Sequence, residues 1–153
     1  MPHYATNRGK LLIAQGAWDD DTAALIRIGL FSGASVPVGI DTQAEVNPLN
    51  FVSDALAIGS VVEATFTNYA RASLTRSNAA EDDGNNRVNL DAADVVFSSA
   101  GGGVNNTLWG GFVFRFVTND ADSPLLSVFV FGSTITTNGS NLTLSIADLY
   151  RLT

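Results

Sequence analysis

The sequence has 153 residues, which is enough for one domain with a sizeable buried core. Its net charge of −7 and its single lysine argue against a clustered cationic surface, so we expect no nucleic-acid partner. The chain lacks cysteine, which excludes disulfides and thiolate sites, and no window of about 18 apolar residues predicts a membrane span. Only 15 % of the residues are charged, against the usual value of about 25 %, which predicts that a partner subunit covers part of the surface.

The N-terminal segment contains the one convincing helix. Apolar residues in "HYATNRGKLLIAQG" follow a helical stripe over about residues 4–16, and Gly16 is placed to end the helix in a left-handed conformation. The acids Asp19–Asp21 follow as a polar turn, and nothing in this region is typical of a signal peptide.

Alternating residues after this turn predict the first strand, "ALIRIGLF", with Ile26, Ile28 and Leu30 on one face. Residues 33–51 then hold two prolines and two glycines, and we expect a long connection with at most one short strand. "VSDALAIGS" predicts one or two helical turns before Gly59. "VVEATFTNY" and "YARASLTR" alternate again and predict two further strands, the first with Val62, Ala64 and Phe66 on one face.

The second half reads as a series of strands and turns. "RVNLDAADVVFSS" predicts two short strands around a tight turn at Asp91–Asp94, and "AGGGVNNT" is expected to be a hairpin connection. "GGFVFRFVT" and "PLLSVFVFG" are apolar on both faces, which is typical of central strands between two layers. In the second of them strict alternation sets Leu126, Val128 and Val130 opposite Leu125, Phe129 and Phe131. About eight strands and one N-terminal helix predict a single domain over residues 1–153, a β-sandwich or jelly-roll-like barrel.

No group of residues predicts catalysis, a cofactor site or a metal site. His3 is the single histidine, and we expect it to be solvated near a mobile terminus. The acidic segment 81–86, "EDDGNN", carries oxygen donors of the kind that calcium prefers, but it lacks the donor spacing of an EF-hand loop. Asp, Gly and Asn are also the residues that a hairpin turn favours, so we prefer the turn and leave calcium open. "GGG" at 101–103 lacks the Lys–Ser/Thr of a phosphate loop.

Four short patterns carry a resemblance to a known group of proteins. They are the N-terminal series Asn7, Lys10, Gly16, Trp18, Asp21 and Thr22; Glu63 with "YARASL" (69–74); "NNRVNLDAADVVF" (85–97); and "TNGSNLTL" (137–144). Together these patterns, which cover nearly the whole chain, resemble small structural proteins of tailed bacteriophage virions, several of which are capsid decoration or cement proteins. The segment between the helix and the second strand departs from the pattern of these virion proteins, because it is longer here and richer in Pro and Gly.

The resemblance implies a non-enzymatic protein on the capsid surface of a virion, made in the host cytoplasm. Its implied partners are the major capsid protein and copies of itself in a homotrimer, without membrane or nucleic acid. Since termini and long loops often carry binding, we expect the contacts in three segments: residues 3–10, 33–51 and 100–107. The candidate contact residues are His3, Tyr4, Asn7, Arg8, Lys10, Pro37, Asn47, Pro48, Phe51, Asn105 and Asn106.

Two alternatives remain open at this point. The first is another virion component, such as the base of a head fibre, a tail protein or a host-recognition module. The second is a small hydrolase or a carbohydrate-binding β-sandwich, in which Trp18, Trp109 and Tyr69 stack on sugar rings while Asp82 and Asp83 hold calcium.

Overall fold

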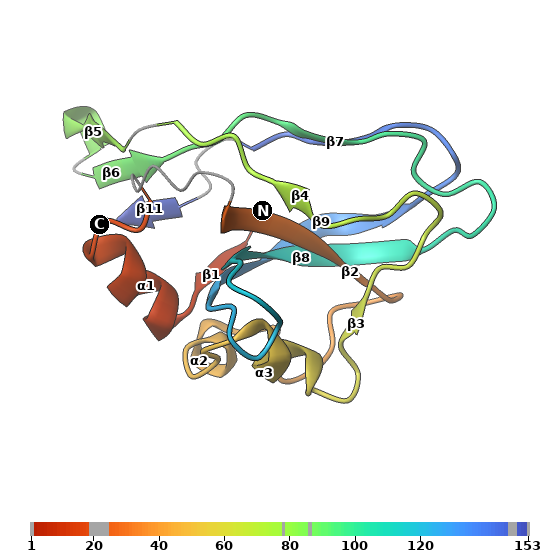
Figure 1. The fold of residues 1–153 in the computed structure, drawn as a ribbon, viewed down its shortest axis with the longest axis horizontal. Helices are drawn as coiled ribbons and strands as arrows, with labels where there is room; N and C mark the ends of the chain where they lie inside the picture. The colour runs from red at the N-terminus through yellow and green to blue at the C-terminus, as the bar shows by residue number, and fades with distance from the viewer. Residues whose placement is uncertain (1, 19–24, 78, 86, 147–149, 153) are drawn as a thin grey trace.

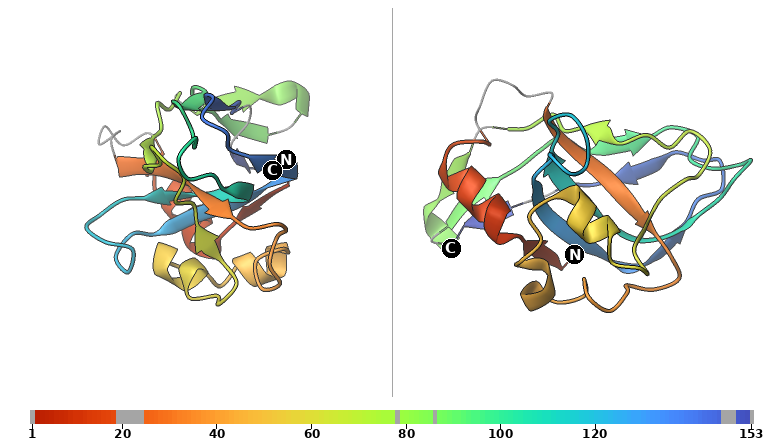
Figure 2. Two further views of the ribbon diagram at one scale, coloured as in Figure 1. Left: turned by 90° about the vertical axis from the view of Figure 1, so that its right-hand side faces the viewer. Right: turned by 60° about the horizontal axis from the view of Figure 1, so that its bottom comes forward.

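The computed structural model describes residues 2–18, 25–77, 79–85, 87–146 and 150–152. Within these ranges the chain is mainly β, with antiparallel sheets and short helices, which confirms the predicted sandwich-like class. A central sheet lies between two small sheets on one side and the helices α2 (Gln43–Val46) and α3 (Val52–Leu56) on the other (Figure 1; Figure 2, left). None of the helices in the described ranges is long and apolar enough to cross a membrane.

The central sheet is antiparallel throughout. Its strands run in the order β1 (His3–Ala5), β9 (Leu125–Thr136), β8 (Thr107–Arg115), β2 (Ile26–Ser32) and β3 (Val62–Glu63), and β4 (Ala72–Ser73) also pairs with β2. The two segments that the sequence marks as apolar on both faces are β8 and β9. β8 lies between β9 and β2, so its predicted central position is confirmed.

Two small sheets cover one face of the central sheet. One pairs β7 (Val95–Phe97) with β10 (Leu142–Leu144), and the other has the order β11 (Tyr150–Leu152), β6 (Arg87–Leu90), β5 (Ala80–Asp82). A 3₁₀ turn at Asp83–Asn85 joins β5 to β6, with Asp82 paired to Arg87, so the acidic segment forms the hairpin turn that the sequence favours. Asn86 and the predicted turn Asp19–Asp21 lie outside the described residues.

The central sheet buries apolar side chains on both faces. Ile26, Ile28 and Leu30 of β2 lie in one cluster, which also takes in residues of β6, β7, β10 and helix α1 (Asn7–Ala14). Phe112 and Phe114 of β8 lie in the opposite cluster, against residues of α2 and α3. Each fully buried side chain of this size contributes roughly 1.5–3 kcal/mol. The chain therefore covers its two most apolar strands with its own elements.

Helix α1 is fixed to the sheet by its capping residue. The Thr6 side chain accepts a hydrogen bond from Gly9 N at 2.7 Å and donates one to the Leu125 carbonyl at 2.5 Å, while Thr6 N donates to the Leu126 carbonyl at 3.0 Å. Gly9 packs directly on the main chain of Leu126, where a Cβ atom would collide with the backbone. Gly16 has a φ of 82° after the last turn, which confirms its predicted role as the end of the helix.

Several predicted boundaries are wrong in the first half of the chain. The helix spans residues 7–14 instead of about 4–16, because His3–Ala5 pair with β9 as strand β1. The connection 33–51 holds helix α2 instead of a short strand, capped by the Thr42 side chain. The predicted strand after residue 60 shrinks to the two residues of β3. Val62 is 54 % exposed, whereas Ala64 and Phe66 are buried.

Two predictions in the second half are also wrong. "AGGGVNNT" is not a hairpin connection, because β7 before it pairs with β10 and β8 after it pairs with β9 and β2, so the segment crosses between layers. Strict alternation also fails at the start of β9. Val113 and Phe114 are consecutive on β8 but pair with Ser127 and Leu125, which leaves Leu126 as an extra, bulged residue. Leu125 therefore shares a cluster with Val128, and Leu126 shares one with Phe129.

Candidate functional site

Two of the three predicted contact segments form one continuous surface. Asn7 N donates to the Asn47 carbonyl at 3.1 Å, and Gln43 Nε2 donates to the Ala5 carbonyl at 2.7 Å and to Asn47 Oδ1 at 2.8 Å. These bonds join residues 3–10 to residues 43–51, and we call the combined region the arm surface. Figure 2 (right) shows β1 and the start of α1 beside α2. Eight of the eleven candidate contact residues belong to it.

The candidates on the arm surface differ in how far they are exposed. Asn7, Lys10 and Pro48 are exposed, whereas His3, Tyr4, Arg8, Asn47 and Phe51 are half-buried. Tyr4 packs against the cluster of α2 and α3, and Phe51 forms an isolated β-bridge with Pro124. The arm surface is therefore anchored to the core by some of its own residues. Pro37 lies in the loop before α2, next to Val38, whose side chain is 80 % exposed.

The third predicted segment belongs to a second surface, at one end of the long axis of the molecule (Figure 1). We call residues 65–68, 98–106 and 137–141 the loop end. Thr65 N donates to Asn106 Oδ1 at 2.6 Å, and Asn106 N donates to Thr137 Oγ1 at 2.9 Å. Main-chain bonds from Thr67 N to the Val104 carbonyl and from Gly139 N to the Ala100 carbonyl complete the link between the three loops.

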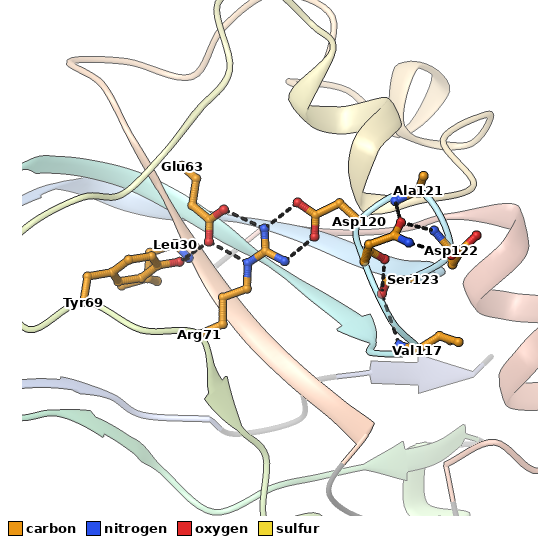
Figure 3. A network of polar contacts seen from close by, with 10 residues as sticks. Leu30, Glu63, Tyr69, Arg71, Val117, Asp120, Ala121, Asp122 and Ser123 are labelled. Atoms are coloured by element: carbon orange, nitrogen blue, oxygen red, sulfur yellow. Dashed lines mark hydrogen bonds and ion pairs between the residues drawn. The ribbon is translucent and has the colours of Figure 1, made fainter.

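Arg71 binds two carboxylates at once, and we call this group the clasp. Its guanidinium donates from Nε and Nη2 to Glu63 at 2.7 and 2.6 Å, and from Nη1 and from Nη2 (at 2.9 Å) to Asp120 (Figure 3). The same guanidinium lies over the rings of Phe112 and Phe114, about 5 Å from each centroid. Two carboxylates thus share one cation, with side-chain exposures of 19 to 36 %.

Tyr69 extends the clasp to the edge of the sheet. Its hydroxyl donates to Glu63 Oε1 at 2.7 Å and accepts from Leu30 N at 3.0 Å, between the stretches of β2 that pair with β3 and β4. Burial and the charge of Glu63 raise the pKa of Tyr69. Burial lowers the pKa of Arg71, but hydrogen bonds to Glu63 and Asp120 outweigh it and raise that pKa overall. Tyr69 and Arg71 therefore each keep one protonation state near neutral pH, and together they position the loop 64–71.

His3 is not the solvated terminal residue that the sequence predicts. It pairs with Phe129 in the sheet, its Nε2 lies 3.0 Å from Ser127 Oγ, and its ring stacks on Phe129. Burial lowers the pKa of His3 to about 4. This serine–histidine contact does not form a hydrolytic site, because Ser127 is fully buried and its hydroxyl cannot reach a substrate.

The sugar-stacking alternative is wrong for the tryptophans. Trp18 and Trp109 are 3 % and 1 % exposed and lie in opposite clusters, so neither offers a ring face to a ligand. Tyr69 stacks on Phe97 with its hydroxyl in the clasp. Within the described ranges, no group of three or more His, Asp or Glu side chains could hold a metal ion. Asp82 accepts from Asn89, and Asp91 accepts from Ala92 N as a turn cap.

An open pocket of about 330 Å³ lies where α1 ends beside the end of β8. It is lined by Leu12, Gln15, Gly16, Ala17 and Arg115. Arg115 is the one charged side chain among the lining residues that the structure describes, and these residues form no acid–base pair.

Sequence reasoning missed Asp120 and Thr6. Nothing near Asp120 marks it as the partner of a residue 49 positions away, and Thr6 reads as an ordinary residue within the predicted helix. Glu63, Tyr69 and Arg71 do belong to a quoted pattern, "E…YARASL", which signals that they act together without showing how.

Comparisons with protein-family models, with curated proteins and with solved structures found no match to this chain.

Proposed function

We propose that this protein is a bacteriophage capsid decoration protein that binds the outer face of the head shell. In this role it acts without catalysis and stabilises contacts between major capsid protein subunits, as an oligomer of identical chains. The proposal starts from the sequence patterns that resemble virion structural proteins. The arm surface is the structural observation that carries it.

The arm surface has the properties that a permanent attachment needs. Main-chain and side-chain hydrogen bonds hold the N-terminal segment on residues 43–51, and Thr6 ties the same segment to β9. A surface that is ordered before binding loses little conformational entropy on association. Asn7 and Lys10 are exposed one turn apart on α1, and Pro48 is exposed next to Asn47, whose carbonyl accepts from Asn7 N. The arm surface thus carries charged, amide and apolar groups, as protein interfaces do.

Binding to shells that lack the protein tests this function. Purified protein is mixed with such particles, and we expect it to sediment with them and to raise the temperature at which they release their contents. Lys10→Glu reverses the exposed charge on the arm surface, and we expect it to weaken attachment by about tenfold or more. The control Ala57→Glu with Ser60→Glu adds the same charge change at exposed positions after α3 and should bind like the natural chain. Absence of the protein from the shell, or shells of equal stability with and without it, contradicts the proposal.

A further inference from the structure

The loop end carries no charged residue, although the chain as a whole has a net charge of −7. There is none between Glu63 and Arg71, none between Asp94 and Arg115, and none between Asp122 and Asp148. These three runs supply all three loops. Apart from the buried Phe66 and Ala100, the loop end is thus built of Ser, Thr, Asn, Gly and a half-exposed valine, Val104.

Uncharged polar groups of this kind can bind their own copies. An amide or a hydroxyl both donates and accepts hydrogen bonds, whereas a carboxylate accepts only and a guanidinium donates only. Residues close to a rotation axis of an oligomer face the same residues of neighbouring copies. A charged residue there would repel its own copy, while Asn, Ser and Thr can pair with theirs. Charge depletion is also the compositional mark of interface cores.

The loop end is also ordered in advance. Asn105 Oδ1 accepts from Gly102 N at 2.8 Å, Asn138 Oδ1 accepts from Ser140 N at 3.0 Å, and Asn141 Oδ1 accepts from Ser99 N at 2.9 Å. Gly101 has a φ of 92° and a position where a Cβ atom would meet the side chains of Asn105 and Thr137. The Arg71 clasp fixes the base of the loop that contributes residues 65–68.

We infer that the loop end is the self-association surface of this protein, and that its occupant is the loop end of a second copy of the chain. The inference rests on the proposed function in one respect, which is that the protein acts as an oligomer. It places the contact between subunits away from the arm surface. Copies of net charge −7 then meet where neither carries charge, and the acidic parts of each copy point outward.

Three substitutions test this contact with little disturbance of the fold. Asn105→Asp, Asn138→Asp and Asn141→Asp each keep the oxygen that accepts the hydrogen bond within the loop end, and each adds one negative charge. The control is Ala14→Glu with Gln15→Glu and Ala44→Glu, which adds the same charge at exposed positions on or beside α1 and α2. Analytical ultracentrifugation over a range of concentrations measures the dissociation constant of each protein, and circular dichroism confirms that each is folded.

We expect the natural chain and the control to sediment as oligomers, and the triple Asn→Asp variant to dissociate with a constant raised by about tenfold or more, because like charges meet at the axis. A natural chain that stays monomeric at the highest soluble concentration overturns the inference. An oligomer that the control disrupts and the Asn→Asp variant does not also overturns it. A monomer that still binds depleted shells would refute self-association while leaving the proposed attachment intact.

Discussion

His3 shows how one residue near the chain end is held by the sheet. It contacts Ser127 and Phe129 of β9, and its environment favours the neutral imidazole. The ordinary histidine pKa of 6.5 applies in the unfolded chain, while burial lowers it to about 4 in the folded protein. Between these two pH values the unfolded chain binds a proton that the folded chain does not, so folding stability falls as the pH falls.

We predict that His3→Gln removes this pH dependence. As the pH falls from 6.5 to 4, the natural chain should lose about 1–3 kcal/mol of stability relative to the variant, the lower part of this range allowing for the residual exposure of the ring. Above pH 6.5 His3 is neutral in the folded and in the unfolded chain, so the free energies of unfolding of the two proteins should differ by a constant amount. Urea unfolding across this pH range measures the difference. Parallel stability profiles for the two proteins would show that burial does not set the titration of His3.

Gly9 is a second residue whose role is set by contact. In an ordinary helix position Gly→Ala stabilises by about 1 kcal/mol. Here the added methyl meets the Leu126 main chain, so we predict that Gly9→Ala destabilises the fold by about 1–3 kcal/mol. Ala14→Gly at the exposed end of the same helix serves as the reference, with a loss of about 1 kcal/mol from helix propensity alone. Thermal unfolding compares the two, and a stabilised Gly9→Ala protein would mean that α1 is not packed on β9.

At the scale of elements, the Arg71 clasp takes the place of a missing strand pair. β3 and β4 each pair with two residues of β2, and the loop between them leaves the sheet to reach the loop end. On this edge neither β3 nor β4 pairs with Leu30, and the Leu30 amide donates to the Tyr69 hydroxyl instead. The Leu30 carbonyl accepts from Ala64 N. The clasp then connects this loop to Asp120, in the turn between β8 and β9.

We predict that Arg71→Lys does not replace the natural residue. Lysine carries its charge on one nitrogen and cannot make two-point contacts with both carboxylates. We therefore expect the free energy of unfolding to fall by about 1–3 kcal/mol. This loss is smaller than for a fully buried ion pair, because the three side chains keep some exposure. Hydrogen exchange should quicken at the amides of Leu30 and Ala64. A double-mutant cycle with Asp120→Asn measures the interaction free energy between Arg71 and Asp120 separately from the contacts with Glu63 and Tyr69. Full stability and unchanged exchange in Arg71→Lys would show that the clasp does not hold the loop.

The strands that could be predicted from the sequence are those whose pattern is local. Alternation or a long apolar run predicts β2, β8 and β9. The position of Gly16 after the apolar stripe predicts the end of the helix. The bulge at Leu126 could not be predicted, because it is fixed by Thr6 and Gly9, which lie some 120 residues earlier in the chain. The arm surface was identified by its segments but not by their contact, since Asn7 and Asn47 meet only through the fold.

At the scale of the whole molecule, the apolar strands are covered within the chain itself, and the uncharged surface lies elsewhere, at the loop end. The low charge content predicts a partner subunit over part of the surface. The two most apolar strands do not need that cover, because α2, α3 and the small sheets already cover both faces of β8 and β9. The uncharged surface lies instead at the loop end, while the acids lie toward the other parts of the chain. The distribution of charge, and not an exposed apolar strand, is therefore what favours a subunit contact.

This arrangement predicts how salt affects self-association. An uncharged contact between two acidic chains gains from screening, because added salt weakens the repulsion between their remaining charges. Raising NaCl from ~0.05 M to ~0.5 M should keep the dissociation constant of the oligomer unchanged or lower it several-fold. Sedimentation at each salt concentration measures this. A steep weakening with salt would instead indicate that ion pairs hold the copies together.

Electron cryo-microscopy of depleted head shells incubated with the purified protein tests the central claim most directly. The account predicts density on the outer face of the shell, with the arm surface against the major capsid protein and loop ends of neighbouring copies in contact. Bare shells after incubation, or density confined to the tail, would contradict it.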